Sequence, residues 1–241
     1  MNIALIFAGG TGQRMNSRTR PKQFLEMNGK PIIVHTLEHF CDHPEIDGII
    51  VVCLKDWIDY LKDLTDKFQL KKIRWIVPGG ETGQESIRNG LYALDKDESV
   101  PKDSVVLIHD GVRPLINAEL ISRNISVTRQ YGNAITVTPA TETIIGINSD
   151  SEVGDIMDRN RCMLARAPQS FILQDIVAAH RRAQSEHLTN VIDSATLMTT
   201  YKTRLHIVEG PVENIKITTP ADFYIFRAIL EARENSQIWG L

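Results

Sequence analysis

Short, continuous apolar runs alternate with amphipathic stretches along the first half of the chain. Four of these runs end in turn-forming or polar residues and are typical of strands buried in a parallel sheet: residues 3–7, 48–54, 73–77 and 104–109. Between them, apolar residues recur at helical spacing on three faces: Ile33, Leu37 and Phe40; Trp57, Leu61 and Leu64; and Ile87, Leu91 and Leu94. This alternation predicts an α/β fold, with a mostly parallel central sheet and helices on both faces.

The pattern changes after Pro139. Residues 143–147 and 152–156 predict two short strands around a polar turn, a β-hairpin that interrupts the α/β order. The hairpin is either a surface excursion or an arm that grips a second subunit. Helices over 172–186 and 190–201, a strand over 205–208 and a closing helix from Pro220, with Thr219 as candidate cap, follow. No linker-like segment is present, so residues 1–241 are interpreted as one domain.

Composition narrows the function classes. The 241 residues include 27 Lys and Arg against 30 Asp and Glu, a formal net charge of −3, whereas a protein that binds nucleic acid by bulk charge is strongly basic. The three cysteines, Cys41, Cys53 and Cys162, are too widely spaced for a metal site and form no disulfide framework. The apolar run at residues 3–8 is too short for a secretory signal or a membrane span. We therefore expect a cytoplasmic protein without nucleic-acid or membrane partners.

The loop after the first strand is the first candidate site, because open α/β sheets bind ligands at the carboxyl ends of their strands. Three glycines there let backbone N–H groups approach an anion: Gly9, Gly10 and Gly12. The dinucleotide fingerprint fails because its third glycine would fall at Met15, and no Gly-Lys-Ser/Thr of a P-loop follows. Arg14 and Lys22 are cations that can reach around a triphosphate; the alternative is a solvated loop with ordinary surface charges.

Five motifs occur in order along the chain: AGGTGQRM at 8–15, PKQFL at 21–25, HDGVRP at 109–114, APQSF at 167–171 and NIKITTP at 214–220. Together they resemble the polyol-phosphate cytidylyltransferases, from residue 2 to about residue 230. The resemblance implies a Rossmann-like nucleotidyltransferase fold with a protruding β-hairpin, a dimerisation arm at about 140–158, and a homodimer. It also implies transfer of CMP from CTP to a polyol phosphate, which yields a CDP-polyol and pyrophosphate.

The same resemblance assigns roles to the cations. Arg14 and Lys22 match residues that bind the CTP phosphates and stabilise the transition state, and Lys216 matches a second lysine near the reacting phosphates. The chemistry of the reaction supports these roles, because attack on the α-phosphorus builds negative charge on the phosphate oxygens, which positioned cations offset. A phosphomonoester has a second pKa of about 6, so the nucleophile is already ionised and needs no general base. The seven histidines, including His35 and His109, are therefore interpreted as structural.

The remaining site residues also follow from the resemblance. Asp110 matches a carboxylate that holds Mg²⁺, or another divalent cation, against the nucleotide; the alternative is an aspartate that caps a turn. Arg113, Thr143 and Arg159 match residues that bind the polyol phosphate, and arginine suits phosphate recognition. The expected nucleotide-binding set is Ala8, Gly9, Gly10, Thr11, Gly12, Gly79, Gly80, Ser86 and Asp110.

Three positions depart from the family pattern. Gly83 stands where an arginine is usual, Arg166 where glutamine is common, and Ala167 where threonine precedes Pro-Gln. The first departure concerns the nucleotide pocket, and the other two concern the pocket for the second substrate.

The favoured acceptor is D-ribitol 5-phosphate, because HDGVRP replaces the HDAARP more common in the enzymes that act on 2-C-methyl-D-erythritol 4-phosphate. That second acceptor, or another sugar or polyol phosphate, is the alternative. A nicotinamide dehydrogenase is disfavoured because the second strand ends in Leu54-Lys55 without an acid. A further alternative is a catalytically inactive relative that still binds nucleotide.

Overall fold

The computed structural model describes residues 1–10, 20–188 and 191–239, with the side chains of residues 236–239 left undescribed. Arg14, Thr11 and Gly12 therefore lie outside the described residues. The central strands are β1 (Asn2–Ala8), β4 (Gly48–Cys53), β5 (Ile73–Pro78), β6 (Val105–Asp110), β7 (Asn133–Pro139), β10 (Met163–Ile172) and β11 (Ile207–Glu209). The helices are α1 (Ile32–Asp42), α2 (Ile58–Lys67), α3 (Gly83–Lys96), α4 (Ala118–Tyr131), α5 (Leu173–Ser185), α6 (Ser194–Thr200) and α7 (Pro220–Trp239).

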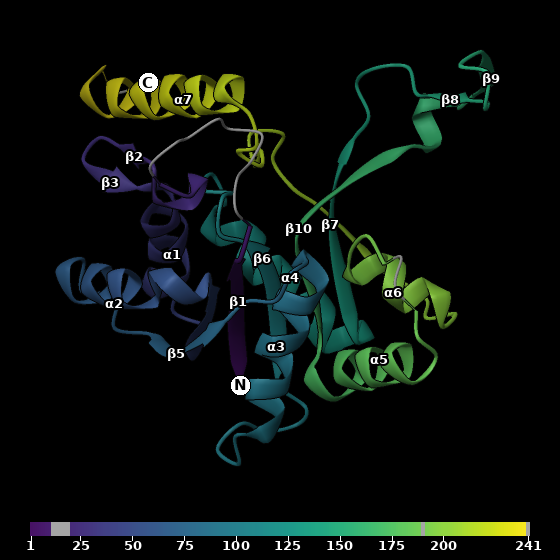
Figure 1. Cartoon of the computed structure of the whole chain (residues 1–241). Coiled ribbons are helices and arrows are strands. Elements are labelled where there is room, and N and C mark those ends of the chain that lie inside the picture. Colours follow the sequence, from purple (N-terminus) through teal and green to yellow (C-terminus); the bar gives the residue numbers. More distant parts are fainter. Residues whose placement is uncertain (11–19, 189–190, 240–241) are drawn as a thin grey trace.

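Within the described residues these strands form one sheet in the order β11-β7-β10-β6-β1-β4-β5. The neighbouring pairs β5–β4, β4–β1, β1–β6 and β7–β11 are parallel, and only β10 runs antiparallel, between β6 and β7. The predicted α/β fold with a mostly parallel sheet is confirmed. Strands β7 and β10, which together with β11 form one end of the sheet, were not predicted from the sequence (Figure 1).

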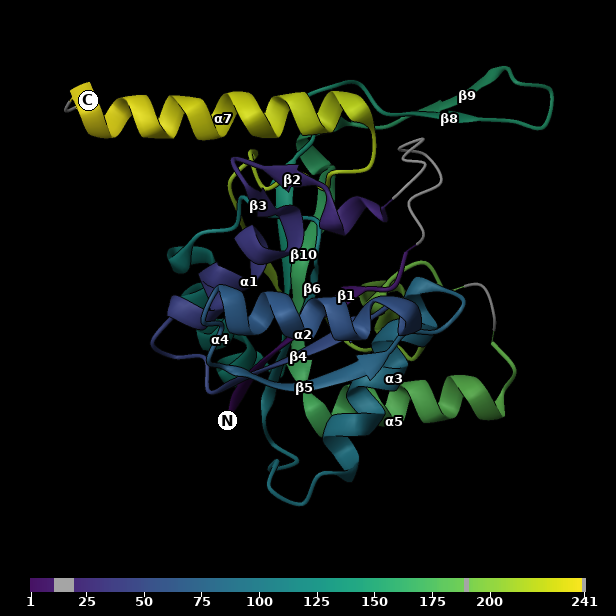
Figure 2. The same ribbon diagram turned by 60° about the vertical axis from the view of Figure 1, so that its left-hand side comes forward.

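Helices cover both faces of the sheet (Figures 1 and 2). Alternate residues of β1 enter different cores: Ala4 and Ile6 pack with α1, α2 and α4, whereas Ile3 and Leu5 pack with α3, α5 and α6. Because both of their faces are buried, β1, β4 and β6 are apolar almost throughout rather than alternating. This explains why their short apolar runs were identifiable from the sequence.

The predicted hairpin is present as β8 (Ile145–Ile147) paired antiparallel with β9 (Val153–Ile156), so its first strand begins two residues later than expected. Both views show it standing away from the central sheet, beyond the ends of β7 and β10 (Figures 1 and 2). We call residues 140–158 the arm. All four residues of β9 are exposed, so the arm has little contact with the rest of its own chain.

The last helix, α7, lies across the end of the sheet where β1 and β6 terminate (Figure 2). Pro220 occupies its first position, as predicted. Asp222 N–H donates to Thr219 Oγ1 at 3.4 Å, and Asp222 Oδ2 accepts from Thr219 N–H at 2.7 Å, so the two residues cap the helix reciprocally. Phe226 packs into a small apolar cluster with Ile32 and Ile217, which fixes α7 above the loops at this end. No helix in the described part of the chain is long and apolar enough to cross a membrane.

Candidate active site

The candidate site lies at the carboxyl ends of the two central parallel strands. Ala8 is the last residue of β1 and Asp110 the last of β6, and their register pairs Phe7 with Asp110. Gly9 and Gly10 follow β1 directly, so the glycine loop begins beside the aspartate. The topology brings together two motifs that are about a hundred residues apart, as the strand-end rule predicts.

Two glycine loops approach each other closely around one hydroxyl group. A Cβ atom on Gly9 would lie 2.6 Å from Ser86 Oγ, and one on Gly79 would lie 3.0 Å from the same oxygen. Gly79 N–H donates to Cys53 O at 2.7 Å, which fixes the second loop on the end of β4. A side chain at Gly9 would displace the buried Ser86, so this close approach requires glycine.

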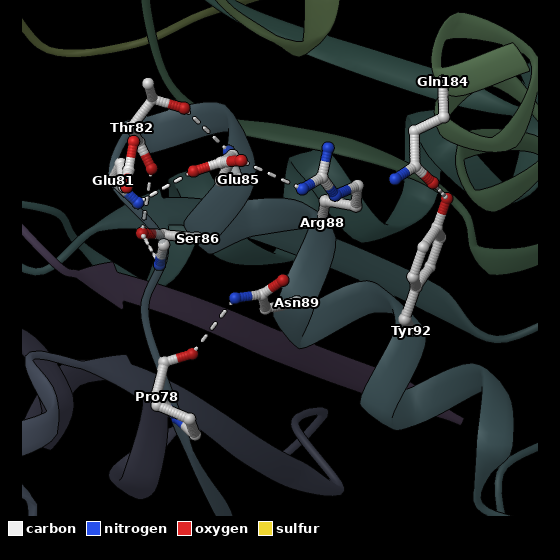
Figure 3. A network of polar contacts seen from close by, with 10 residues as sticks. Pro78, Glu81, Thr82, Glu85, Ser86, Arg88, Asn89, Tyr92 and Gln184 are labelled. Atoms are coloured by element: carbon white, nitrogen blue, oxygen red, sulfur yellow. Dashed lines mark hydrogen bonds and ion pairs between the residues drawn. The ribbon is translucent and has the colours of Figure 1, made fainter.

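The start of α3 is held by a dense set of hydrogen bonds (Figure 3). Thr82 caps the helix by accepting from Glu85 N–H at 3.1 Å, and Ser86 Oγ donates to Thr82 O at 3.0 Å while accepting from Gly80 N–H at 3.1 Å. Glu85 Oε2 accepts from Glu81 N–H at 2.8 Å. The loop before α3 is thus tied to the first helical turn, whose free N–H groups favour an anion.

Gly83 is the first residue of α3, and nothing lies within 4 Å of the position where its Cβ would be. The side chain that is usual at this position in the family would therefore project into open space. Gly83 thus leaves room for a nucleotide group at this position but makes no side-chain contact with it.

Lys22 reaches this loop on a short 3-10 turn, η2 (Lys22–Phe24). Its neighbour Gln23 is 1% exposed and donates through Nε2 to Ala8 O at 2.6 Å and to Gly10 O at 3.3 Å. Gln23 thus fixes the position of Lys22 relative to the glycine loop. Gln23 was not identified as a site residue from the sequence, although it belongs to the Pro-Lys-Gln motif.

Asp110 is the centre of a buried charge cluster. Its Oδ1 lies 2.5 Å from Lys216 Nζ, and its Oδ2 lies 2.7 Å from Arg113 Nε. Burial raises the pKa of Asp110, but the two cations more than offset this, so its pKa lies well below the ordinary range. Asp110 is therefore ionised, and it holds both cations in fixed positions.

Asn214 joins this cluster to β10. Its backbone O accepts from Arg113 Nη1 at 2.9 Å, and its fully buried side chain donates to Ala167 O at 2.7 Å. Arg113 is 8% exposed, so Asp110 and Asn214 engage much of its guanidinium group. Asn214 lies two residues before Lys216 and was also not identified as a site residue from the sequence.

Two cavities meet at the charge cluster. The first, of about 430 Å³, carries both glycine loops, Lys22 and the start of α3. The second, of about 260 Å³, is bounded by β10, α3 and the residues before α6, and includes Arg113 and Arg166. The described residues that line both cavities are Phe7, Gly83, Asp110 and Lys216. We call the first the glycine-loop cavity and the second the β10 cavity.

Thr143 and Arg159 lie elsewhere. Both are exposed, Thr143 on the arm and Arg159 directly after it, and Arg159 Nη1 donates to Thr141 O at 3.2 Å. Neither is among the described residues that line the two cavities. Of the three residues expected to bind the polyol phosphate, only Arg113 lies with Asp110 and Lys216.

Asp110 can supply one carboxylate ligand to a divalent cation but not a complete ligand set. Within the described chain no group of three or more His, Cys, Asp or Glu side chains could hold a metal ion. Both oxygens of Asp110 already contact cations, yet each carboxylate oxygen has more than one lone pair. The residues fit a cation that arrives with nucleotide phosphates, for which one carboxylate and waters complete the ligand set.

The histidines near the sheet are structural. Burial lowers the pKa of His109 to about 4 despite the adjacent Asp110, and its Nε2 lies 3.1 Å from Arg113 O. Burial also lowers the pKa of His180, on α5, to about 4. Both rings are neutral at pH 7, and neither is placed as a general base at the charge cluster.

We expect acid to destabilise the fold through these two rings. A folded pKa of about 4 against an ordinary 6.5 means that the unfolded chain binds more protons between these pH values. The free energy of unfolding should therefore fall as pH drops from 6.5 to 4, by on the order of 3 kcal/mol per ring. Urea unfolding of His180→Gln should show a shallower pH dependence, whereas His187→Asn, at an exposed position, should match the wild type. Equal slopes for all three proteins would contradict this.

Comparison with known proteins agrees with the geometry. Residues 2–232 match the family model described as IspD: 2-C-methyl-D-erythritol 4-phosphate cytidylyltransferase. Over its whole length the chain is 53% identical to the ribitol-5-phosphate cytidylyltransferase of Streptococcus agalactiae serotype III and 52% identical to that of Vibrio parahaemolyticus, with 100% of each chain covered. The crystal structure of 4-diphosphocytidyl-2C-methyl-D-erythritol synthase from Anaerococcus prevotii superposes with a TM-score of 0.81 at 30% identity, over 95% of both chains. This chain belongs to the IspD family of CTP-dependent cytidylyltransferases.

Proposed function

We propose that this protein transfers CMP from CTP to D-ribitol 5-phosphate, which yields CDP-ribitol and pyrophosphate. The observation that carries the reaction type is the meeting of two cavities at Asp110 and Lys216, one lined by glycine loops and the other by arginines. The choice of ribitol rests on the full-length similarity to proteins named for that substrate. The family model and the Anaerococcus structure are named for methylerythritol phosphate, which makes it the second candidate acceptor.

In this proposal CTP occupies the glycine-loop cavity and the acceptor occupies the β10 cavity. A phosphate oxygen of the acceptor attacks the α-phosphorus of CTP, and pyrophosphate leaves. Lys22 and Lys216 offset the charge that accumulates on the phosphate oxygens in the transition state. Arg14 is proposed to act with them. The acceptor phosphate is ionised near neutral pH, which is consistent with a site that has no free histidine at its centre.

Members of this family are generally dependent on a divalent cation. We propose Mg²⁺, held by Asp110 and the nucleotide phosphates, where it would neutralise phosphate charge and orient the triphosphate. Lys216 and Arg113 position the Asp110 carboxylate for this role. We also propose that residues 1–241 form one domain and that the reaction takes place in the cytoplasm, where CTP is present.

Turnover of defined acceptors tests the proposal directly. The full chain is assayed with CTP and Mg²⁺ for pyrophosphate release, and the nucleotide product is identified by mass spectrometry. We expect kcat/KM for D-ribitol 5-phosphate to exceed that for 2-C-methyl-D-erythritol 4-phosphate by at least about tenfold. The reverse order would favour the second candidate. CTP binding without turnover of any polyol phosphate would identify an inactive relative.

We further propose a homodimer that forms through the arm. Its strands expose large apolar side chains, with Ile147 at 71%, Ile156 at 69% and Val153 at 59%. An isolated two-stranded ribbon is only marginally stable in water, and an exposed apolar surface of this kind favours a partner. In such a dimer Thr143 and Arg159 would serve the site of the partner subunit, because they lie outside the cavities of their own chain.

Mixed dimers test this arrangement. Light scattering at micromolar concentration should give twice the 27.1 kDa chain mass, and Ile147→Asp should shift the protein towards monomer, whereas Tyr224→Asp on α7 should not. Arg159→Ala and Lys22→Ala chains should each be nearly inactive alone. After mixing and subunit exchange, activity should recover to about one quarter of wild type, because half of the dimers are mixed and each has one intact site of two. A monomer, or no recovery in proven mixed dimers, would overturn the proposal.

A further inference from the structure

Arg166 stands where β10 changes its pairing. The register between β10 and β7 shifts between Ala165 and Gln169, and residues 165–167 of this irregular stretch line the β10 cavity. Arg166 is partly buried there, and its Nε donates to the buried Thr138 Oγ1 at 3.3 Å. That single bond attaches the guanidinium group to β7 and leaves both of its terminal nitrogens for other partners.

Among the charges that line the β10 cavity, Arg166 is the cation without a carboxylate partner in the described structure. Asp110 is shared by Arg113 and Lys216. The remaining acid, Asp193, uses Oδ1 to cap α6 by accepting from Thr196 N–H at 2.8 Å, and its Oδ2 accepts from Gln169 Nε2 at 2.8 Å. The carboxylates of the cavity are therefore committed to other groups.

The surroundings also make the charge of Arg166 unfavourable in the empty cavity. Burial, and then the neighbouring positive charge of Arg113, lower the pKa of Arg166. A guanidinium group remains protonated even so, because its ordinary pKa is so high. A partly desolvated cation beside a second cation is stabilised when an anion enters the cavity.

We propose that Arg166 binds the phosphate group of the acceptor. The inference rests on the proposed function and names a residue that the resemblance did not assign. The acceptor phosphate must lie beside Asp110 and Lys216 to reach the α-phosphorus, and these residues line the same cavity as Arg166. Two terminal guanidinium nitrogens can bind two phosphate oxygens at once, which the glutamine common in the family cannot do with equal charge.

The effect of substitutions on KM for the acceptor, compared with their effect on KM for CTP, distinguishes binding of the acceptor from a structural role. Arg166→Gln should raise KM for the acceptor by roughly 10- to 150-fold, the loss expected for one charge-assisted bidentate contact, and should change KM for CTP less than twofold. Arg166→Lys keeps the positive charge but loses the paired guanidinium nitrogens, so its acceptor KM should lie between those of the wild type and Arg166→Gln. Arg204→Gln removes an exposed arginine outside both cavities and should leave both constants unchanged.

Inorganic phosphate provides a second readout that does not depend on the identity of the polyol. It should inhibit the wild type competitively with the acceptor, and its inhibition constant should rise at least tenfold in Arg166→Gln. Thermal melting confirms that the variants fold. Unchanged acceptor KM and phosphate inhibition, or equal changes in both Michaelis constants, would overturn the role of Arg166. If the wild type used a different polyol phosphate, the proposed acceptor would be wrong, while Arg166 would be judged on the acceptor actually used.

Discussion

Lys22→Ala should lower kcat by about 100-fold or more while the protein remains folded. Lys22 lies on the wall of the glycine-loop cavity beside Gly9 and Gly10, and Gln23 holds it there through two bonds to the loop backbone. A positioned charge that stabilises developing phosphate charge contributes roughly 3 kcal/mol to the transition state. Initial rates of pyrophosphate release at saturating CTP and acceptor measure the loss.

Lys71→Ala is the matched control, because Lys71 is an exposed lysine outside both cavities. It should retain wild-type kcat. If Lys22→Ala kept its kcat and only raised KM for CTP, Lys22 would bind the ground state and the transition state equally, and its catalytic role would be wrong.

Asp110→Asn should cost both activity and stability. The substitution leaves Arg113 buried without its carboxylate, and breaking a buried ion pair on one side costs about 3–5 kcal/mol. It also releases Lys216 from its 2.5 Å contact, so kcat should fall by about 100-fold or more. Urea unfolding and initial rates, measured on the same preparations, give both quantities.

A double variant separates the two effects. Adding Arg113→Gln to Asp110→Asn removes the uncompensated charge, so the double variant should unfold at a higher urea concentration than Asp110→Asn alone. Its activity should stay low because the carboxylate is still missing and Arg113, which lines the β10 cavity, is missing as well. Recovery of activity together with stability would mean that Asp110 matters only for folding.

The sequence predicted β1, β4 and β6 well because their two buried faces make them almost continuously apolar. It did not predict β10, since Arg166 and Pro168 interrupt its apolar pattern and its first three residues are exposed. The position of β10 between β6 and β7 depends on pairing across the sheet, which no local pattern encodes. The helix expected over 190–201 begins at Ser194, because Asp193 caps it there.

The candidate site was predicted residue by residue but not as an arrangement. The motifs identified Asp110 and Lys216 separately, while the ion pair between them depends on the packing of segments about a hundred residues apart in the sequence. Gln23 and Asn214 were overlooked because buried amides have no distinctive spacing, and their role is visible only in what they bond to. The arm was predicted correctly as a hairpin, since its turn is local.

The wall that the two cavities share has a consequence for inhibition. A single compound that joins a cytidine to a polyol through a non-hydrolysable diphosphate would pass Asp110 and Lys216 and fill both cavities at once. Its cytidine half would meet the glycine loops and Lys22, and its polyol half would meet Arg113 and Arg166. Selectivity would come from the polyol half, where the lining is made of side chains. Compounds confined to the glycine-loop cavity would contact neither Arg113 nor Arg166 and would lack this source of selectivity.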